Sequence, residues 1–294
     1  MSVSIERPGI VVGVDGSPAS KVAVDWAARD AALRNVALTL VHVANGMVAP
    51  WARTPLPSGF GKWQQQRGHQ FIDDAIRVAE AAVGDSGRIQ MRTEMYYSAT
   101  VPTLVDVSKD AEMAVVGSRG QGALGGILGS VSAGMVQHAH CPVAVIHDED
   151  PLMPYPAQAP VLVGIDGSPT SELATAIAFD EASRRHVNLI ALHAWSDGGV
   201  MGFPGMDWSR MKTSEDAVLA ERLAGWQERY PDVTVHRHVA CDRPARQLVE
   251  HSEAAQLVVV GSHGRGGFAG MLLGSVSAAV VQSARMPVIV ARPA

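Results

Sequence analysis

The chain has little of what marks a secreted or a membrane protein. Only two cysteines occur among 294 residues, Cys141 and Cys241, which is too few for a disulfide framework or a cysteine-rich metal site. No apolar run approaches the roughly 18 residues that span a bilayer. The first ten residues also lack the apolar centre of an export signal. We therefore expect a cytoplasmic protein with no membrane span.

Basic and aromatic residues are also scarce. The chain carries 24 Lys and Arg against 29 Asp and Glu, a net charge of −5, so it lacks the basic footprint of a dedicated nucleic-acid binder. We expect no nucleic-acid partner. Aromatic residues make up 5% while hydrophobic residues reach 47%, so packed cores must be built from Val, Leu, Ile and Ala. The 29 glycines leave many backbone positions without a Cβ atom.

What the chain does contain is a long internal repeat. The segment Val12–Pro18, Val-Gly-Val-Asp-Gly-Ser-Pro, returns 151 residues later as Val163–Pro169, Val-Gly-Ile-Asp-Gly-Ser-Pro. Near the end of each half, Val116–Gly120 returns as Val260–Gly264. A period this long is a whole domain and not a solenoid unit, so we predict a tandem duplication. Acidic residues and prolines between Asp148 and Pro160 predict a linker, which gives domains at 1–150 and 151–294.

Short apolar runs alternate with helical patterns in each half. In the first half we predict strands at 10–14, 38–43, 89–97, 114–116 and 142–146, and helices from Ser17-Pro18 and over 63–83, 101–109 and 130–139. Strands joined by helical crossovers form right-handed units with a parallel sheet covered on both faces. The predicted fold class is α/β, with two tandem doubly wound domains of five parallel strands each.

The residues suited to binding follow the predicted strands. Asp15 and Asp166 end the first strand of each half, and Gly-rich loops, Gly117–Ser130 and Gly261–Ser275, follow the fourth. Ligands of open parallel sheets bind at the carboxyl ends of the strands. The loops lead into helix N-termini, where free amides, a hydroxyl and the helix dipole favour a phosphate. The sequence therefore predicts a phosphate site in each half.

Structural roles remain open for the same residues. A glycine loop can be only a tight connection, and the two aspartates can cap the turns that follow them. Arg119 and Arg265 can pair with phosphates or be solvated. Neither loop is a Walker A element, because no Gly-Lys-Ser/Thr follows its glycines. His138, His140 and Cys141 are too few to predict a metal site.

These motifs carry a resemblance. Gly-x2-Gly-x9-Gly-Ser/Thr after the fourth strand, with Val-Gly-x-Asp-Gly-Ser ending the first, resembles the universal stress protein family over both halves. The tandem arrangement is similar to the two-domain members of mycobacteria and related actinobacteria. The resemblance implies an adenine-nucleotide α-hydrolase-like fold with strand order 3-2-1-4-5. It also implies ATP as ligand, alone or with Mg²⁺, and a role in stress response and growth control.

The resemblance also implies site residues. In the first half they are the strand-end and loop residues Gly13, Asp15, Val43, Gly117, Arg119, Gly120, Gly129, Ser130, Val131 and Ser132. In the second half they are Gly164, Asp166, Ala194, Gly261, Gly264, Arg265, Gly274, Ser275, Val276 and Ser277. The aspartates would hold the adenosine, the backbone at Val43 and Ala194 would line the adenine, and the glycines and serines would cradle the phosphates. The first loop is one residue shorter than the family pattern, so we expect weaker ATP occupancy there.

No catalytic set is identifiable from spacing, and no catalytic residue is predicted. We favour a regulator or sensor whose bound nucleotide alters an interaction with a protein partner, and we expect a homodimer. The alternatives are a slow ATPase, a nucleotide-free scaffold and a protein that binds cyclic AMP.

Overall fold

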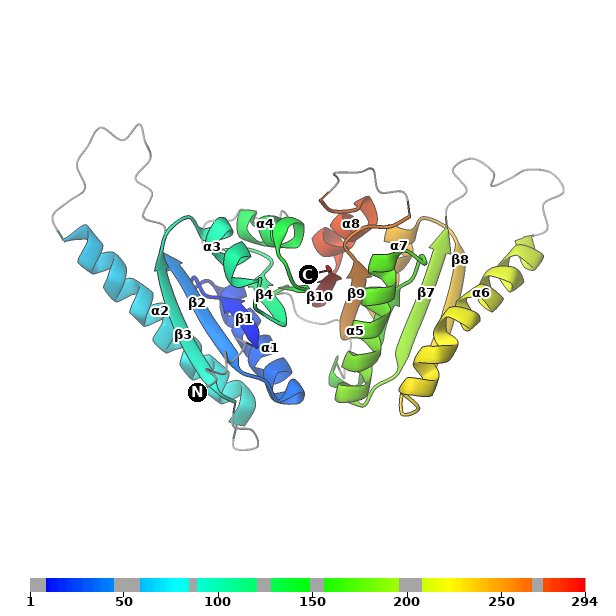
Figure 1. Ribbon diagram of the computed structural model, residues 1–294, viewed down its shortest axis with the longest axis horizontal. Coiled ribbons are helices and arrows are strands. Elements are labelled where there is room, and N and C mark those ends of the chain that lie inside the picture. The colour runs from blue at the N-terminus through cyan, green and yellow to red at the C-terminus, as the bar shows by residue number, and fades with distance from the viewer. Residues whose placement is uncertain are drawn as a thin grey trace, which may run out of the picture. The chain divides into compact units, whose positions relative to one another are not determined.

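The computed structural model of the chain describes residues 9–44, 59–84, 89–120, 128–148, 156–195, 208–265 and 272–293. The chain divides into two compact units, one ending at Asp148 and one running over Glu149–Pro293. In each unit, helices cover both faces of a parallel sheet (Figure 1). None of the helices in the described ranges is long and apolar enough to cross a membrane.

The first unit alternates strands and helices along the chain. Its elements are β1 (Ile10–Gly13), α1 (Pro18–Arg34), β2 (Leu38–Ala44), α2 (Phe60–Val83), β3 (Met91–Tyr97), α3 (Thr100–Val107), β4 (Met113–Gly117), α4 (Ser130–His138) and β5 (Val143–Ile146). The strands are parallel and lie in the order β3-β2-β1-β4-β5, which confirms the predicted fold class and the strand order that the family resemblance implied. Helix α1 packs on α2 and α3 packs on α4, so two helices cover each face.

The second unit repeats this plan. After a short 3-10 turn, η2 (Pro156–Gln158), come β6 (Val161–Gly164), α5 (Pro169–Arg185), β7 (Leu189–Trp195), α6 (Trp208–Arg229), β8 (Val235–Cys241), α7 (Pro244–Ser252), β9 (Leu257–Gly261), α8 (Ser275–Ser283) and β10 (Val288–Ala291). Its strands lie in the order β8-β7-β6-β9-β10, again parallel. The strand order of the first unit is therefore repeated.

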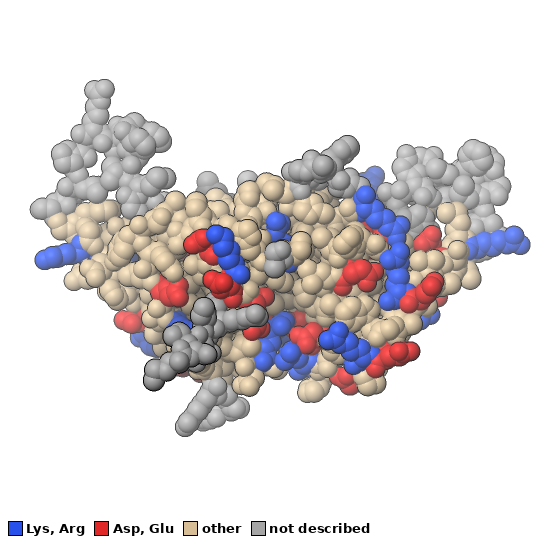
Figure 2. All heavy atoms as spheres, viewed as in Figure 1, with Lys and Arg blue, Asp and Glu red and all other residues tan. Residues whose placement is uncertain are grey.

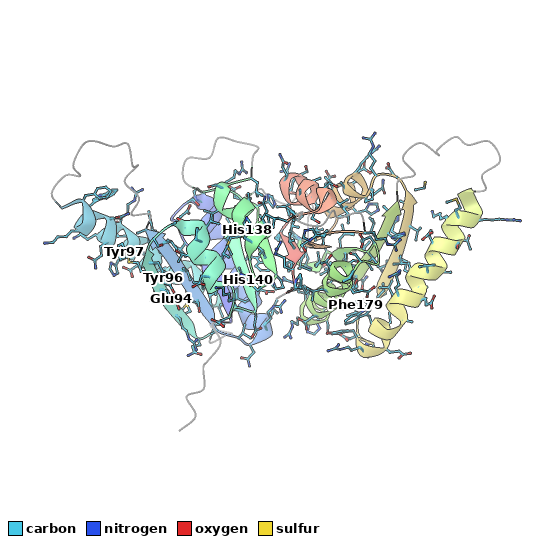
Figure 3. All side chains as sticks on the ribbon, turned by 45° about the horizontal axis from the view of Figure 1, so that its top comes forward. Glu94, Tyr96, Tyr97, His138, His140 and Phe179 are labelled. Atoms are coloured by element: carbon cyan, nitrogen blue, oxygen red, sulfur yellow. The ribbon has the colours of Figure 1, made fainter. Side chains whose placement is uncertain are left out.

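Small aliphatic residues build the cores. Strands β5 and β10 are buried along their whole length, and the inner face of α1 is alanine, with Ala23, Ala27 and Ala31 fully buried. Alanine lets a helix approach the sheet closely, which is how a chain with few aromatic rings fills its interior. Phe179 on α5, labelled in Figure 3, is fully buried and stacks on Trp226 of α6 and on Tyr230, which follows the end of that helix, with ring centroids 6.0 and 5.7 Å apart.

Helices α1 and α5 begin and end alike. The hydroxyls of Ser17 and Ser168 accept hydrogen bonds from amides in the first turn, and a proline follows each serine at the first helical position. Both helices end on a left-handed residue, Asn35 or His186, each at φ 54°. Each also holds a buried ion pair between residues one turn apart at its C-terminal end.

Charged side chains are mixed by sign on the surface. Figure 2 shows blue and red residues interspersed over the described part of the face it presents. Some of this mixing comes from pairs one turn apart on a helix, such as Asp25 with Arg29 on α1 and Asp180 with Arg184 on α5. Exposed pairs of this kind contribute only a few tenths of a kcal/mol each, roughly 0.3–0.5.

Candidate functional site

A pocket opens where β1, β2 and β4 of the first unit end. Its volume is about 790 Å³, and it is bounded by the strand ends, by the start of α4 and by one side of α2. All ten site residues predicted in the first half line it: Gly13, Asp15, Val43, Gly117, Arg119, Gly120, Gly129, Ser130, Val131 and Ser132. Residues from four separate parts of the sequence therefore meet around one cavity, at the edge of the sheet where ligands of this architecture bind.

Asp15 has one oxygen in a turn and one facing the loop after β4. Its Oδ1 accepts a hydrogen bond from the Ser17 amide at 2.9 Å, which is the Asx cap considered from the sequence. Its Oδ2 faces Gly120, where a Cβ atom would come within 2.9 Å. The capping role and a position at the pocket are thus combined in one carboxylate.

The start of α4 presents the amides of its first turn without a side-chain cap. Gly129 is the N-cap residue in an extended conformation, and no side chain caps the helix. The first amides of an α-helix have no acceptor within the helix and carry the positive end of its dipole. Ser130, exposed at the first position of α4, adds a hydroxyl beside them. An anionic group fits this end of the pocket.

Ser132 and Gly117 hold that helix in place. The Ser132 hydroxyl donates to the carbonyl oxygen of Gly117 at 2.7 Å, so the first turn of α4 is tied to the end of β4. A Cβ on Gly117 would lie 2.8 Å from the backbone of Ala19 on α1. Gly117 is therefore needed for the contact of β4 with α1, a packing role that the sequence did not indicate.

The second unit places its predicted residues in the same way. Asp166 Oδ1 accepts from the Ser168 amide at 2.9 Å, and its Oδ2 accepts from the Arg265 amide at 3.1 Å. Gly264 faces the same carboxylate, Ser277 donates to the Gly261 carbonyl, and Gly274 begins α8 uncapped by a side chain. The other predicted residues lie at strand ends or in the first turn of α8: Gly164, Ala194, Ser275 and Val276.

The model of the universal stress protein family matches residues 8–147 and again residues 159–292. The chain belongs to the universal stress protein family. It is 61% identical to the universal stress protein Rv2623 of Mycobacterium tuberculosis H37Rv and 59% identical to Rv2005c of the same strain, each over 99% of both chains. A crystal structure of a universal stress protein from Archaeoglobus fulgidus superposes with a TM-score of 0.70 at 20% identity, covering 99% of this chain and 100% of the other. That likeness supports the fold.

Parts of the predicted sites of this universal stress protein lie outside the described residues. They are the loop residues 121–127 and 266–271, which include most of the two stretches whose lengths differ by one. The expected effect of the shorter first loop on occupancy stays a prediction. Arg119, at the start of the first loop, forms an ion pair with Asp148 at 2.8 Å.

Five pocket residues on α2 were missed from the sequence: Trp63, Gln64, Arg67, Gly68 and Phe71. The guanidinium of Arg67 lies over two rings, 5.2 Å from the centroid of Trp63 and 5.3 Å from that of Phe71. We call Trp63, Arg67 and Phe71 the α2 ladder; they line the pocket on the side away from α4. Their spacing of four residues, with a cation between two aromatic residues, is the signal that could have shown them on one face of the helix.

His42 also lines the pocket of this family member. Its Nδ1 lies 2.7 Å from the carbonyl oxygen of Val14, so Nδ1 carries the proton and Nε2 is an acceptor in the neutral ring. Gly68 lets α2 approach, because a Cβ there would be 2.9 Å from the His42 ring. Among the described residues, no group of three or more His, Cys, Asp or Glu side chains could hold a metal ion.

Proposed function

We propose that this universal stress protein is an adenine-nucleotide-binding regulator of stress response and growth in the cytoplasm, with ATP as its ligand. The observation that carries the proposal is the pocket of the first unit, where a carboxylate, a glycine loop and an uncapped helix N-terminus converge. Bound nucleotide would favour one conformation and so alter the interaction with a regulatory protein partner. The protein itself would be a homodimer.

The two ends of the pocket suit the two ends of a nucleotide. The phosphates would lie at the start of α4, held by the amides of its first turn and by the Ser130 hydroxyl. Asp15 would accept hydrogen bonds from the ribose with its carboxylate, which lines the pocket beside Gly120. The adenine would lie along the backbone at Val43, between the strand ends and α2.

The arrangement favours binding over hydrolysis. Among the described pocket residues the ionisable side chains are Asp15, His42, Arg67 and Arg119. Asp15 caps a turn, the Nδ1 of His42 is tied to a backbone carbonyl, and Arg119 is paired with Asp148. None of these contacts forms a pair of nucleophile and base. We therefore propose a nucleotide sensor, with slow ATP turnover as the competing function.

The test is nucleotide content. Mass spectrometry of the freshly purified, denatured protein should recover ATP or ADP, and isothermal titration of the emptied protein should show ATP binding more tightly than cyclic AMP. Recovery of no nucleotide together with no binding of added ATP would overturn the proposal. Steady release of phosphate from ATP would instead favour the ATPase.

Asp15 and Asp166 provide matched variants. Asp15→Ala should weaken binding at the first site about 10- to 100-fold, because a hydrogen bond to a charged group contributes roughly 1.5–3 kcal/mol. Asp166→Ala should do the same at the second site alone. Circular dichroism checks that loss of the Asx cap leaves the fold intact. Unchanged stoichiometry and affinity in the double variant would contradict the site assignment.

A further inference from the structure

Two histidines of the second unit lie side by side outside the strand-end site. His238 is on β8 and His251 is on α7, and both are partly exposed. Their ring centroids are 4.3 Å apart and the rings are tilted by 50°. The pair thus bridges an edge strand and a helix that are joined through the chain only by the turn after Cys241.

The separation of the rings is compatible with two imidazoles on one metal ion. Imidazole nitrogens bind metals at about 2.0–2.1 Å, which puts each ring centre about 3.2 Å from the ion. Two rings at a right angle about the ion then have centres about 4.5 Å apart, whereas a tetrahedral angle requires about 5.2 Å. The 4.3 Å spacing fits the right-angled geometry, which Cu²⁺ and Ni²⁺ prefer.

Both rings are held in the form that binds a metal. His251 Nδ1 lies 2.9 Å from the carbonyl oxygen of Gln247, so that nitrogen carries the proton and Nε2 keeps its lone pair. The Gln247 side chain is hydrogen-bonded to the His238 ring, so one nitrogen of His238 is occupied and the other is the one that would bind a metal. A neutral imidazole is the metal-binding state.

The surroundings carry charges of both signs. Lys212 faces His238 from α6 and opposes a cation. Gln247 donates to Asp242 at 2.9 Å and to Glu250 at 3.4 Å, so two carboxylates lie beside the pair on the same helix and its approach. Arg243 and Arg246 act on Asp242, and Arg246 is bonded to Glu250. Because the described residues offer no third ligand that joins the pair, water would complete the coordination.

The first unit lacks the pair. Glu94 pairs with Val41 in the sheet of the first unit, and His238 pairs with the equivalent Leu192 in the second. Glu94 is therefore the counterpart of His238. Glu94 instead accepts a hydrogen bond from the Tyr96 hydroxyl at 2.7 Å, and both are labelled on β3 in Figure 3. Val107 on α3 is the counterpart of His251, since Leu104 and Leu248 occupy equivalent places against Gly13 and Gly164.

We infer that His238 and His251 form a two-imidazole site for a divalent late transition-metal ion, Cu²⁺ or Ni²⁺ ahead of Zn²⁺, that clamps β8 to α7. The inference is independent of nucleotide binding. The duplication provides its own comparison, because the same two positions of the first unit carry no imidazole.

The test is thermal unfolding of the full chain, stripped with EDTA and carrying no polyhistidine tag, with and without NiCl₂ at pH 7.5. A site that binds the folded state selectively should raise the Tm of the second unit by about 2–5 °C when the ion is well above its Kd. The same protein with one equivalent of Cu²⁺ should show hyperfine coupling to two nitrogens in its electron paramagnetic resonance spectrum.

Matched variants decide the assignment. His238→Gln and His251→Gln should each abolish the rise, whereas His69→Gln should keep it. His69 has the same helical Nδ1 bond, to Gln65 at 2.9 Å, and no second imidazole pairs with it among the residues that the structure describes. Lys212→Gln should lower the Ni²⁺ concentration needed, since it removes an opposing charge. A rise that persists in both ligand variants, or no rise and no nitrogen coupling in the unaltered protein, would overturn the inference.

Discussion

The two units keep the same strand ends but differ in the helix that covers them. Gly16 and Gly167 have the same left-handed backbone, with φ of 78° and 77°, yet a Cβ on the first would meet the ring of Phe71 and one on the second the guanidinium of Arg222. His42 packs edge-on against Phe71, while His193 Nε2 lies 3.5 Å from the Glu215 carboxylate. Aromatic packing in one unit is thus replaced by charge in the other.

The two units therefore agree on one side of the site and differ on the other. The turn after the first strand, the glycines and the serine that ties the last helix to its strand recur in both units with the same hydrogen bonds. The residues of α2 and α6 do not recur. The two copies are therefore alike at the end of the site where phosphate binding is proposed, and they differ on the opposite side.

The largest expected effect on stability concerns a buried ion pair that occurs in both units. Asp30 and Glu181 are fully buried and bonded to Arg34 and Arg185, each at 2.8 Å. Asp30→Ala should lower the free energy of unfolding of the first unit by about 3 kcal/mol, because it leaves a mostly buried arginine without its carboxylate. Hydrogen exchange read peptide by peptide should show the loss in α1.

Glu181→Ala should cause the same loss of hydrogen-exchange protection in α5 and leave the protection of α1 unchanged. If one of the two variants had no effect, the pairs would not be equivalent and the comparison would fail at that point. The full chain is used because each unit then serves as the internal reference for the other.

A smaller effect is expected where the two units divide side-chain volume differently between a helix and the strand beneath it. Gly68 of α2 lies against Met95 of β3, and a Cβ on Gly68 would be 2.2 Å from the Met95 methyl group. At the equivalent positions the second unit has Leu219 and Val239, both buried. Gly68→Leu should destabilise the first unit by about 1–3 kcal/mol through overpacking.

Met95→Val should recover much of that loss, because the double variant recreates the pair of the second unit. Chemical denaturation of the two single variants and the double variant measures the coupling. If the losses of unfolding free energy in the two single variants simply add in the double variant, the helix positions of the two units differ in more than these side chains.

The smallest effect is one of pH. The hydrogen bond to Glu94 raises the pKa of Tyr96 to about 12. Because the folded protein then holds the phenolic proton more tightly than the unfolded chain, this contribution to stability is present below about pH 10 and is lost as the pH rises through 12. Ultraviolet titration should find a tyrosine ionising near pH 12, and Glu94→Gln should lower that pKa. An unchanged titration in the variant would remove Glu94 as the cause.

The fold could be predicted because its signals are local. Ser17-Pro18 predicted the start of α1, and buried apolar runs predicted most strands to within a few residues. Helix α2 begins at Phe60, one turn before the predicted start, since Gly59 with φ of 92° leads directly into it. Strand β3 begins at Met91 and not at residue 89, and its polar alternation reflects its position at the edge of the sheet.

The first pocket could be predicted in part, and for a similar reason. Motif residues at strand ends are brought together by any parallel sheet of this order, so all ten lie around one cavity. The α2 ladder and the place of His42 depend on the distance between a helix and the sheet, which Gly68 sets through its contact with Met95. The pairing of Arg119 with Asp148 joins residues 29 positions apart and has no local signature.

That last ion pair makes phosphate binding at Arg119 an exchange. The guanidinium is already neutralised by Asp148, and both side chains are about one quarter exposed, at 28%. A phosphate that binds Arg119 would share the guanidinium with this carboxylate or compete with it, so its net gain is smaller than the full strength of an isolated ion pair. Raising the ionic strength weakens both competitors together. Selection at this position would thus rest on the shape and charge of the anion, with little help from long-range attraction.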